Sequence, residues 1–158
     1  MLYIVFRLDD DRYALPAQQV VEVLPLLQLK RWPQAPRGVA GICTYRGRPV
    51  PVLDLSELCL GRSAPRCLST RLLLLHYPQH DPDAPTHWLG LIAEDATDTA
   101  RVDAAEFVDA GLRSDGAPYL GPVAARADGL LQRLDIAALL PPALRETLFV
   151  EAEATWAA

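Results

Sequence analysis

Prolines are spread through the whole chain, and they limit the structures that it can form. Fourteen of the 158 residues are proline. An interior proline removes a backbone hydrogen-bond donor from a helix and clashes with the preceding turn. Long helices are therefore excluded over most of the sequence, and we expect a mainly β fold of short strands and loops.

Length and composition predict one domain with a core of its own. The chain has the length of one ordinary domain, and 51% of its residues are apolar. A domain of this size buries about 70% of the surface that its unfolded chain exposes. A large multidomain enzyme is excluded.

The charged residues argue against a nucleic-acid partner. Twenty acidic residues outweigh fifteen basic ones and give a net charge of -5. The basic residues are single, scattered arginines apart from Lys30, so the basic cluster that attracts nucleic acid is missing. The sequence also contains no apolar run of membrane-spanning length and no export signal, so we expect no direct membrane insertion.

Cysteine usage favours a reducing compartment. Cys43, Cys59 and Cys67 form no CxxC pair and cannot all pair with one another. We expect all three to be small buried apolar residues in a cytoplasmic protein.

Strand patterns are clearest in the first half of the chain. Residues 2–8 alternate in the period of a strand, and an acidic turn then leads into 13–16, which predicts a hairpin. Residues 18–23 fit neither period, so a helical turn and a strand both stay open. A second hairpin is predicted from 39–43 and 50–53, with its turn at Tyr45-Arg46-Gly47.

A capping motif predicts a short helix after the second hairpin. Asp54 stands three residues before Glu57, the spacing of a capping box, so a helix should run over 55–60 and stop at Gly61. The second half of the chain predicts strands at 71–77, 88–94 and 97–102, a hairpin of 118–125 with 129–134, and a C-terminal helix at 142–154.

One short pattern occurs twice and suggests an internal duplication. Residues 53–58 and 134–139 share a strand end, a capping aspartate and two apolar helix positions. We therefore expect one domain built from two similar β halves, the first covering about 1–65 and the second about 66–140.

Catalytic, metal-binding and cofactor-binding motifs are missing. His76, His80 and His87 lie around a proline-containing loop, where they would not face one ion, so we interpret the segment as a solvated connection. There is no GxSxG elbow and no phosphate-binding glycine motif. We expect no enzyme activity, no metal and no cofactor.

Two residues of the second hairpin leave alternatives open. Arg46 occupies the tight turn beside Gly47, and it is either an ordinary solvated arginine or a binding residue. Gly41 lies inside an apolar strand, where it either accommodates packing or marks a close approach of another backbone.

Residues 41–55 lie close to the pattern G-[VI]-x-N-L-R-G-x-[VI]-[VI]-P-[VI]-[VIL]-D-L. By this segment most strongly, and more loosely from about Leu2 to Leu140, the chain resembles the CheW family of coupling proteins in bacterial chemosensory arrays. Further matching segments are residues 3–8, 13–16, 20–23, 90–94, 119–121 and 134–136. Two departures are Thr44-Tyr45, where the family has Asn-Leu, and Glu94, where it has aspartate.

The resemblance implies a fold, a role and a set of partners. The fold would be mainly β, with two five-stranded SH3-like β-barrel subdomains related by a pseudo-two-fold axis, short helices and a C-terminal helix. The role would be a non-catalytic adaptor that couples the cytoplasmic tip of a chemoreceptor to the regulatory domain of a CheA-type histidine kinase. Other CheW-like proteins in a membrane-anchored receptor array are further expected partners.

The same resemblance assigns partner-binding positions. Carried over by motif, they are Val20, Glu22, Gly41, Arg46 and Gly47. Because Thr44-Tyr45 adjoins this turn, a divergent partner set is expected. Two other classes stay open on the residues alone: a small-ligand-binding β-barrel, and an enzyme that uses the histidine loop.

Overall fold

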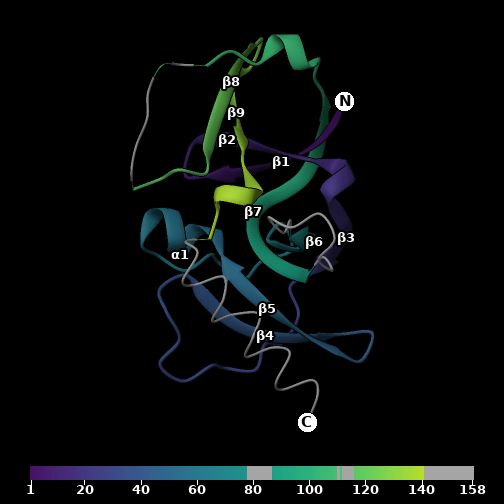
Figure 1. Cartoon of the computed structure of the whole chain (residues 1–158), viewed down its shortest axis with the longest axis vertical. Coiled ribbons are helices and arrows are strands. Elements are labelled where there is room, and N and C mark those ends of the chain that lie inside the picture. Colours follow the sequence, from purple (N-terminus) through teal and green to yellow (C-terminus); the bar gives the residue numbers. More distant parts are fainter. Residues whose placement is uncertain (78–86, 110, 112–115, 141–158) are drawn as a thin grey trace.

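Strands make up most of the part of the chain that the structure describes (Figure 1). The structure is a computed structural model and describes residues 1–77, 87–109, 111 and 116–140. Its strands are β1 (Leu2–Leu8), β2 (Asp11–Pro16), β3 (Val20–Pro25), β4 (Val39–Tyr45), β5 (Arg48–Asp54), β6 (Arg71–Tyr77), β7 (His87–Arg101), β8 (Leu120–Arg126) and β9 (Gly129–Leu134). Helical segments are α1 (Leu55–Leu60) and the 3-10 turns η1 (Ala17–Gln19), η2 (Ala104–Glu106) and η3 (Ile136–Ala138). The mainly β prediction is confirmed.

The strands form two sheets that share β7. In the lower sheet of Figure 1 the order is β3-β6-β7-β5-β4, with β7 antiparallel to β6 and parallel to β5. In the upper sheet the order is β7-β1-β2-β9-β8. Each sheet thus has five strands, as the resemblance implied, and β7 belongs to both.

A bulge in the middle of β7 lets one strand serve both sheets. Asp95 has a φ of 52°, and the pairing with β1 shifts register between Val5 and Arg7. Two steps along β1 here correspond to four along β7, and extra residues of this kind bend a strand and increase its twist. The sequence predicted two strands here, 88–94 and 97–102. That division was wrong, because the interruption is a bulge within one continuous strand.

Three apolar clusters fill the fold. The central core draws side chains from both sheets, including Phe6 and Leu8 of β1 and Leu73 and Leu75 of β6. Two smaller clusters each consist mainly of side chains from one sheet. The lower core contains Cys43, Tyr45, Val50, Val52, Leu72, Leu74 and Ile92, and the upper core contains Tyr3, Val5, Ala14, Val102, Ala124 and Leu131.

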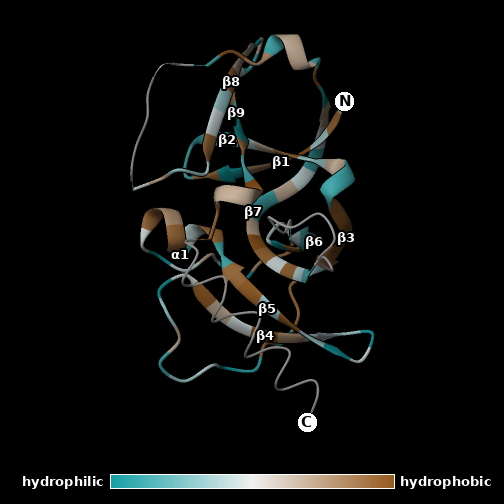
Figure 2. Ribbon diagram, in the orientation of Figure 1, coloured by the Kyte–Doolittle hydropathy of each residue, from teal (hydrophilic) through white to brown (hydrophobic). Residues whose placement is uncertain are grey.

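This layering explains why several strands are apolar at successive positions. Successive side chains of a strand point to opposite faces of its sheet. In Leu72–Leu75 two leucines enter the lower core and two enter the central core, so neither face meets water. In Figure 2 brown covers much of β4 and β5, while the hairpin tip between them is hydrophilic.

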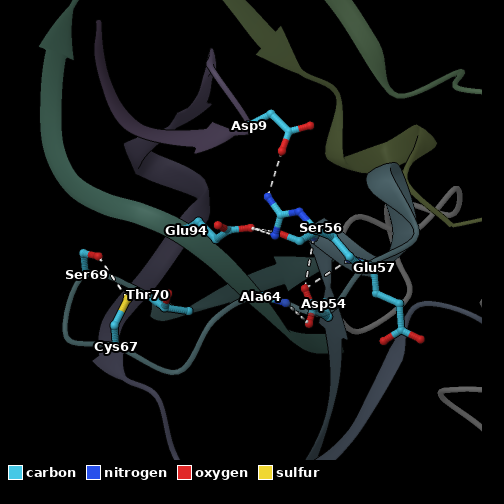
Figure 3. A network of polar contacts seen from close by, with 10 residues as sticks. Asp9, Asp54, Ser56, Glu57, Ala64, Cys67, Ser69, Thr70 and Glu94 are labelled. Carbon is cyan, nitrogen blue, oxygen red and sulfur yellow. Dashed lines mark hydrogen bonds and ion pairs between the residues drawn. The ribbon is translucent and has the colours of Figure 1, made fainter.

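The repeated sequence pattern corresponds to repeated local structure. Asp54 caps α1 by accepting hydrogen bonds from the backbone N–H groups of Ser56 (3.0 Å) and Glu57 (3.3 Å), as predicted (Figure 3). It also accepts one from the backbone N–H of Ala64 (2.9 Å). Asp135 stands at the start of η3 and accepts from Ala137 N–H at 3.1 Å.

The two sheets are also joined by a polar network around Arg62. Its guanidinium donates to Asp9 of the β1–β2 turn (2.9 Å) and to Glu94 of β7 (3.0 Å), and these hydrogen bonds raise the pKa of Arg62 (Figure 3). Ser56 of α1 donates its hydroxyl hydrogen to the same Glu94 carboxylate. Glu94, which departs from the family's aspartate, therefore connects α1, β7 and the upper sheet.

The remaining expectations have different outcomes. Residues 18–23, left open by the sequence, begin in η1 and continue as β3. The expected helix at 142–154 lies outside the described residues. The division near residue 65 stays a prediction, and β1 and β2 of the first half pair with β7 and β9 of the second. Within the described residues, no helix is long and apolar enough to cross a membrane.

We predict unequal effects for the two capping aspartates. Asp54→Ala removes three hydrogen bonds at a buried position and should lower the free energy of unfolding by about 2 to 3 kcal/mol. Asp135→Ala is the matched control, with one such bond at an exposed position, and should cost about 0.5 to 1 kcal/mol. Urea unfolding of both variants measures the difference, and equal losses would contradict this account of the caps.

Candidate partner-binding site

The turn between β4 and β5 places Arg46 at an exposed tip. Tyr45 pairs with Arg48, so the loop has two residues, and Arg46 and Gly47 have φ values of 50° and 78°. Two successive positive φ values are typical of a type I′ turn, whose twist matches that of the strands it joins. The predicted turn is confirmed, and the Arg46 side chain is fixed at its base by a rigid hairpin.

An alternating stack of arginines and aromatic rings surrounds this turn. The guanidinium carbon of Arg46 lies 5.2 Å from the ring centroid of Tyr45. The Tyr45 ring meets the Trp88 ring edge to face, with centroids 5.2 Å apart, and Arg48 lies 5.2 Å from the centroid of Trp88. Cation–π contacts of this kind orient a guanidinium without neutralising it.

Glu22 belongs to the same cluster through a hydrogen bond. Tyr45, which is 8% exposed, donates its phenolic hydrogen to the carboxylate of Glu22 on the exposed edge strand β3. This bond and burial raise the pKa of Tyr45, because ionisation would place a phenolate beside a carboxylate, whereas the charge of Arg46 acts in the opposite direction. Tyr45 thus connects two of the predicted site residues.

Gly41 supports the hairpin at a close backbone approach. A Cβ at this position, with φ 149°, would lie 2.5 Å from the carbonyl oxygen of Lys30. Lys30 and Ile42 exchange two backbone hydrogen bonds of 2.8 and 2.9 Å beside it. Of the two alternatives left open for Gly41, the close approach is the one observed.

The five predicted positions do not form one cluster. Glu22, Arg46 and Gly47 gather at the turn, joined by contacts with Tyr45. Val20 pairs with Leu75, is half-buried and packs against the central core. Gly41 lies within β4, and its close contact is with Lys30.

Sequence reasoning missed Tyr45 and Trp88 as parts of the site. Tyr45 occupies a position where the sequence departs from the family pattern, and this departure was the only signal in the sequence that pointed to it. Trp88 is the second residue of β7 and lies 43 positions further along the chain. No local spacing relates the two rings.

The cysteines are only partly as expected. Cys43 is buried in the lower core, Cys59 is half-buried, and Cys67 is exposed in the loop after α1. For Cys67 the prediction of burial was wrong. Its sulfur lies 3.3 Å from the Ser69 hydroxyl and 3.4 Å from that of Thr70, and these hydrogen bonds lower the pKa of the thiol.

No metal centre is visible in the described ranges. None of their His, Cys, Asp and Glu side chains form a group of three or more that could hold an ion. His80 of the predicted histidine loop lies outside the described residues.

Comparison with known families places the chain. A sequence model described as CheW-like domain matches residues 2–143. The chain belongs to this family. It is therefore a non-catalytic CheW-like scaffold of chemotaxis signal transduction, as the resemblance implied.

Two individual proteins illustrate this membership. The scaffolding protein TtCheW from Thermoanaerobacter tengcongensis superposes with a TM-score of 0.75 at 20% identity, over 89% of this chain and 87% of that one, which shows a common fold. Protein FrzA of Myxococcus xanthus is 38% identical over 53 residues. That match covers 34% of this CheW-like chain and 33% of FrzA, so it spans about a third of the curated relative.

We predict that the two site glycines differ in their tolerance of alanine. Gly41→Ala should lower the free energy of unfolding by about 3 kcal/mol, because the new Cβ meets a backbone carbonyl that cannot move aside. Gly47→Ala is the control, since a Cβ there has no heavy atom within 4 Å and meets only the left-handed backbone, a cost of about 1 kcal/mol. Thermal unfolding compares them, and a Gly41→Ala variant as stable as Gly47→Ala would contradict the close approach.

Proposed function

We propose that this chain is the adaptor that connects a chemoreceptor to a CheA-type histidine kinase. In this role it binds the cytoplasmic tip of the receptor and the regulatory domain of the kinase, without chemistry of its own. It works in the cytoplasm at membrane-anchored receptor arrays, where other CheW-like proteins are further partners. The family match over residues 2–143 is the observation that carries the proposal.

Arg46 is proposed as the direct contact to the receptor. Its guanidinium is exposed on a rigid turn, and within the described residues no carboxylate forms an ion pair with it. A guanidinium binds a carboxylate through two parallel hydrogen bonds, which give direction as well as affinity. A protein surface with an accessible carboxylate is therefore the complement that this tip fits.

The other proposed site residues support or extend that contact. Gly47 supplies the left-handed position that the two-residue turn requires, and Gly41 lets β4 approach Lys30. Val20 and Glu22 lie on β3, an edge strand that pairs only with β6 among the described strands. The proposed site thus includes residues of β3 as well as the turn.

Packing favours the adaptor over a ligand-binding barrel. Apolar side chains fill the lower and upper cores. A surface hollow of about 190 Å³ is lined by Val5 and by charged residues, among which Arg7 pairs with Asp95 and Arg12 with Asp128. It is smaller than the usual 300 to 1,000 Å³ of ligand pockets, and four of its five charged residues pair with one another.

Binding measurements with Arg46→Ala test the proposal. The purified chain should retain a chemoreceptor and a CheA-type kinase from extracts of its own cells, identified by mass spectrometry. In titrations with that receptor's cytoplasmic domain, Arg46→Ala should weaken binding by about 1 to 3 kcal/mol, the worth of a hydrogen bond to a charged group. Unfolding should be unchanged.

Arg101→Ala is the matched control, because Arg101 is an exposed arginine at the far end of β7 in the upper sheet. It should bind the receptor like the parent. Retention of neither receptor nor kinase would overturn the proposed function, and equal effects of both variants would remove Arg46 from the site.

A further inference from the structure

We propose that Tyr45 is the positioning residue that sets the specificity of this site, and that Glu22 acts through Tyr45 rather than by contact with the partner. The inference rests on the proposed function of the turn and deepens it. In this arrangement the phenol holds the Glu22 carboxylate at its hydroxyl end and carries the Arg46 guanidinium on its ring. Of these residues, only Arg46 then contacts the carboxylate of the partner.

The position of the phenol supports this division of roles. The hydroxyl donates to Glu22, whereas the ring contacts Arg46 at 5.2 Å and Trp88 at 5.2 Å. The ring itself is almost fully buried, although both charged neighbours are exposed. Because the buried ring contacts both Glu22 and Arg46, a change in the position of one charged side chain can alter the position of the other.

The Tyr45 ring restricts the rotamers of Arg46 in the free protein, so Arg46 loses less conformational entropy when a partner binds. A free arginine side chain samples many rotamers and pays for ordering when it docks. Contact with the Tyr45 face, supported in turn by the edge-to-face contact with Trp88, restricts the guanidinium before any partner arrives. Such preorganisation increases affinity without adding a contact to the partner.

The hydroxyl gives Glu22 a function within the protein. An unrestrained carboxylate this close to the turn could pair with Arg46 and compete with the carboxylate of a partner. Instead, Glu22 accepts the phenolic hydrogen, and no ion pair joins Glu22 to Arg46 among the described residues. The feature of Glu22 that matters is then its acceptor oxygen, not its charge.

The positioning of Arg46 by Tyr45 distinguishes this chain from the family pattern. The family pattern has leucine at this place, and leucine offers neither a hydroxyl for Glu22 nor a π face for Arg46. The substitution therefore changes how Arg46 is presented while the arginine itself is kept. This is the expected behaviour of a residue that selects among partners with similar carboxylates.

Conservative variants separate the hydrogen bond from the charge. Glu22→Gln retains an acceptor oxygen for Tyr45 and should bind the receptor's cytoplasmic domain within about twofold of the parent. Glu22→Ala and Tyr45→Phe each remove the hydrogen bond and should each weaken binding about three- to tenfold. Because they remove the same interaction, the double variant should be no weaker than either single one.

Removal of the ring should have the larger effect. Tyr45→Leu eliminates both contacts and should weaken receptor binding more than Tyr45→Phe does. Tyr3→Phe is the matched control, because it removes a phenolic hydroxyl from the upper core and should leave binding unchanged.

A readout in the free protein makes the inference independent of the receptor. The NMR signal of the Arg46 Nε–H group, assigned by its loss in Arg46→Lys, should shift in Tyr45→Phe, Tyr45→Leu and Glu22→Ala, and stay in place in Glu22→Gln and Tyr3→Phe. A salt titration should leave these differences in the first three variants intact, since they arise from positioning rather than from screened long-range charge.

The contradicting outcomes are distinct. Equal losses in Glu22→Gln and Glu22→Ala, or additive losses in the double variant, would show that Glu22 meets the partner directly and would overturn the inference. An Arg46 signal unchanged in Tyr45→Phe and Tyr45→Leu would also overturn it. A parent chain that binds no receptor would overturn the proposed function, and the Arg46 signal would still decide whether Tyr45 positions Arg46.

Discussion

Sharing of β7 between two sheets is the constraint on which the rest of the structure depends. One strand can pair with β5 and β6 at one end and with β1 at the other only if it bends between them, and the left-handed Asp95 provides that bend. Sharing also buries both faces of the neighbouring strands. The central core follows from it, because β1 and β6 direct alternate side chains into the space between the sheets.

The same strand supports the candidate site. Trp88 stands near the start of β7 and packs against Tyr45, so the aromatic ring below Arg46 is held by the strand that joins the sheets. At the bulge, Glu94 binds Ser56 and Arg62, and Arg62 reaches Asp9 in the upper sheet. The Arg46 turn and the junction of the sheets are therefore parts of one mechanical unit. A partner that binds the turn is therefore connected through Tyr45, Trp88 and β7 to both sheets.

Local sequence patterns predicted the helix caps and tight turns, because these features depend on residues that are close together in the chain. The helix capped by Asp54 and ended by Gly61, and the turn at Arg46 and Gly47, depend on residues within a few positions of one another. Spacing alone determines such features. The repeated aspartate pattern likewise corresponds to two local caps, Asp54 at α1 and Asp135 at η3.

Features that depend on distant residues were not predictable in this way. The Tyr45–Glu22 hydrogen bond joins residues 23 positions apart, and the Tyr45–Trp88 contact joins two strands that are not sequence neighbours. The bulge at Asp95 is defined by pairing with the distant strand β1, so the sequence predicted two strands there instead of one. Cys67 was expected inside because free cysteine is among the most buried residue types, whereas its loop leaves it exposed.

The central claim is that this chain physically links receptor and kinase, and reconstitution tests it most directly. The cytoplasmic domain of the receptor, clustered on vesicles, and the CheA-type kinase would be mixed with and without the purified chain, and kinase autophosphorylation would be followed. The account predicts that receptor signalling state changes the phosphorylation rate only when the chain is present, and that a ternary complex sediments with the vesicles. Receptor control of the kinase to the same extent without the chain would contradict it.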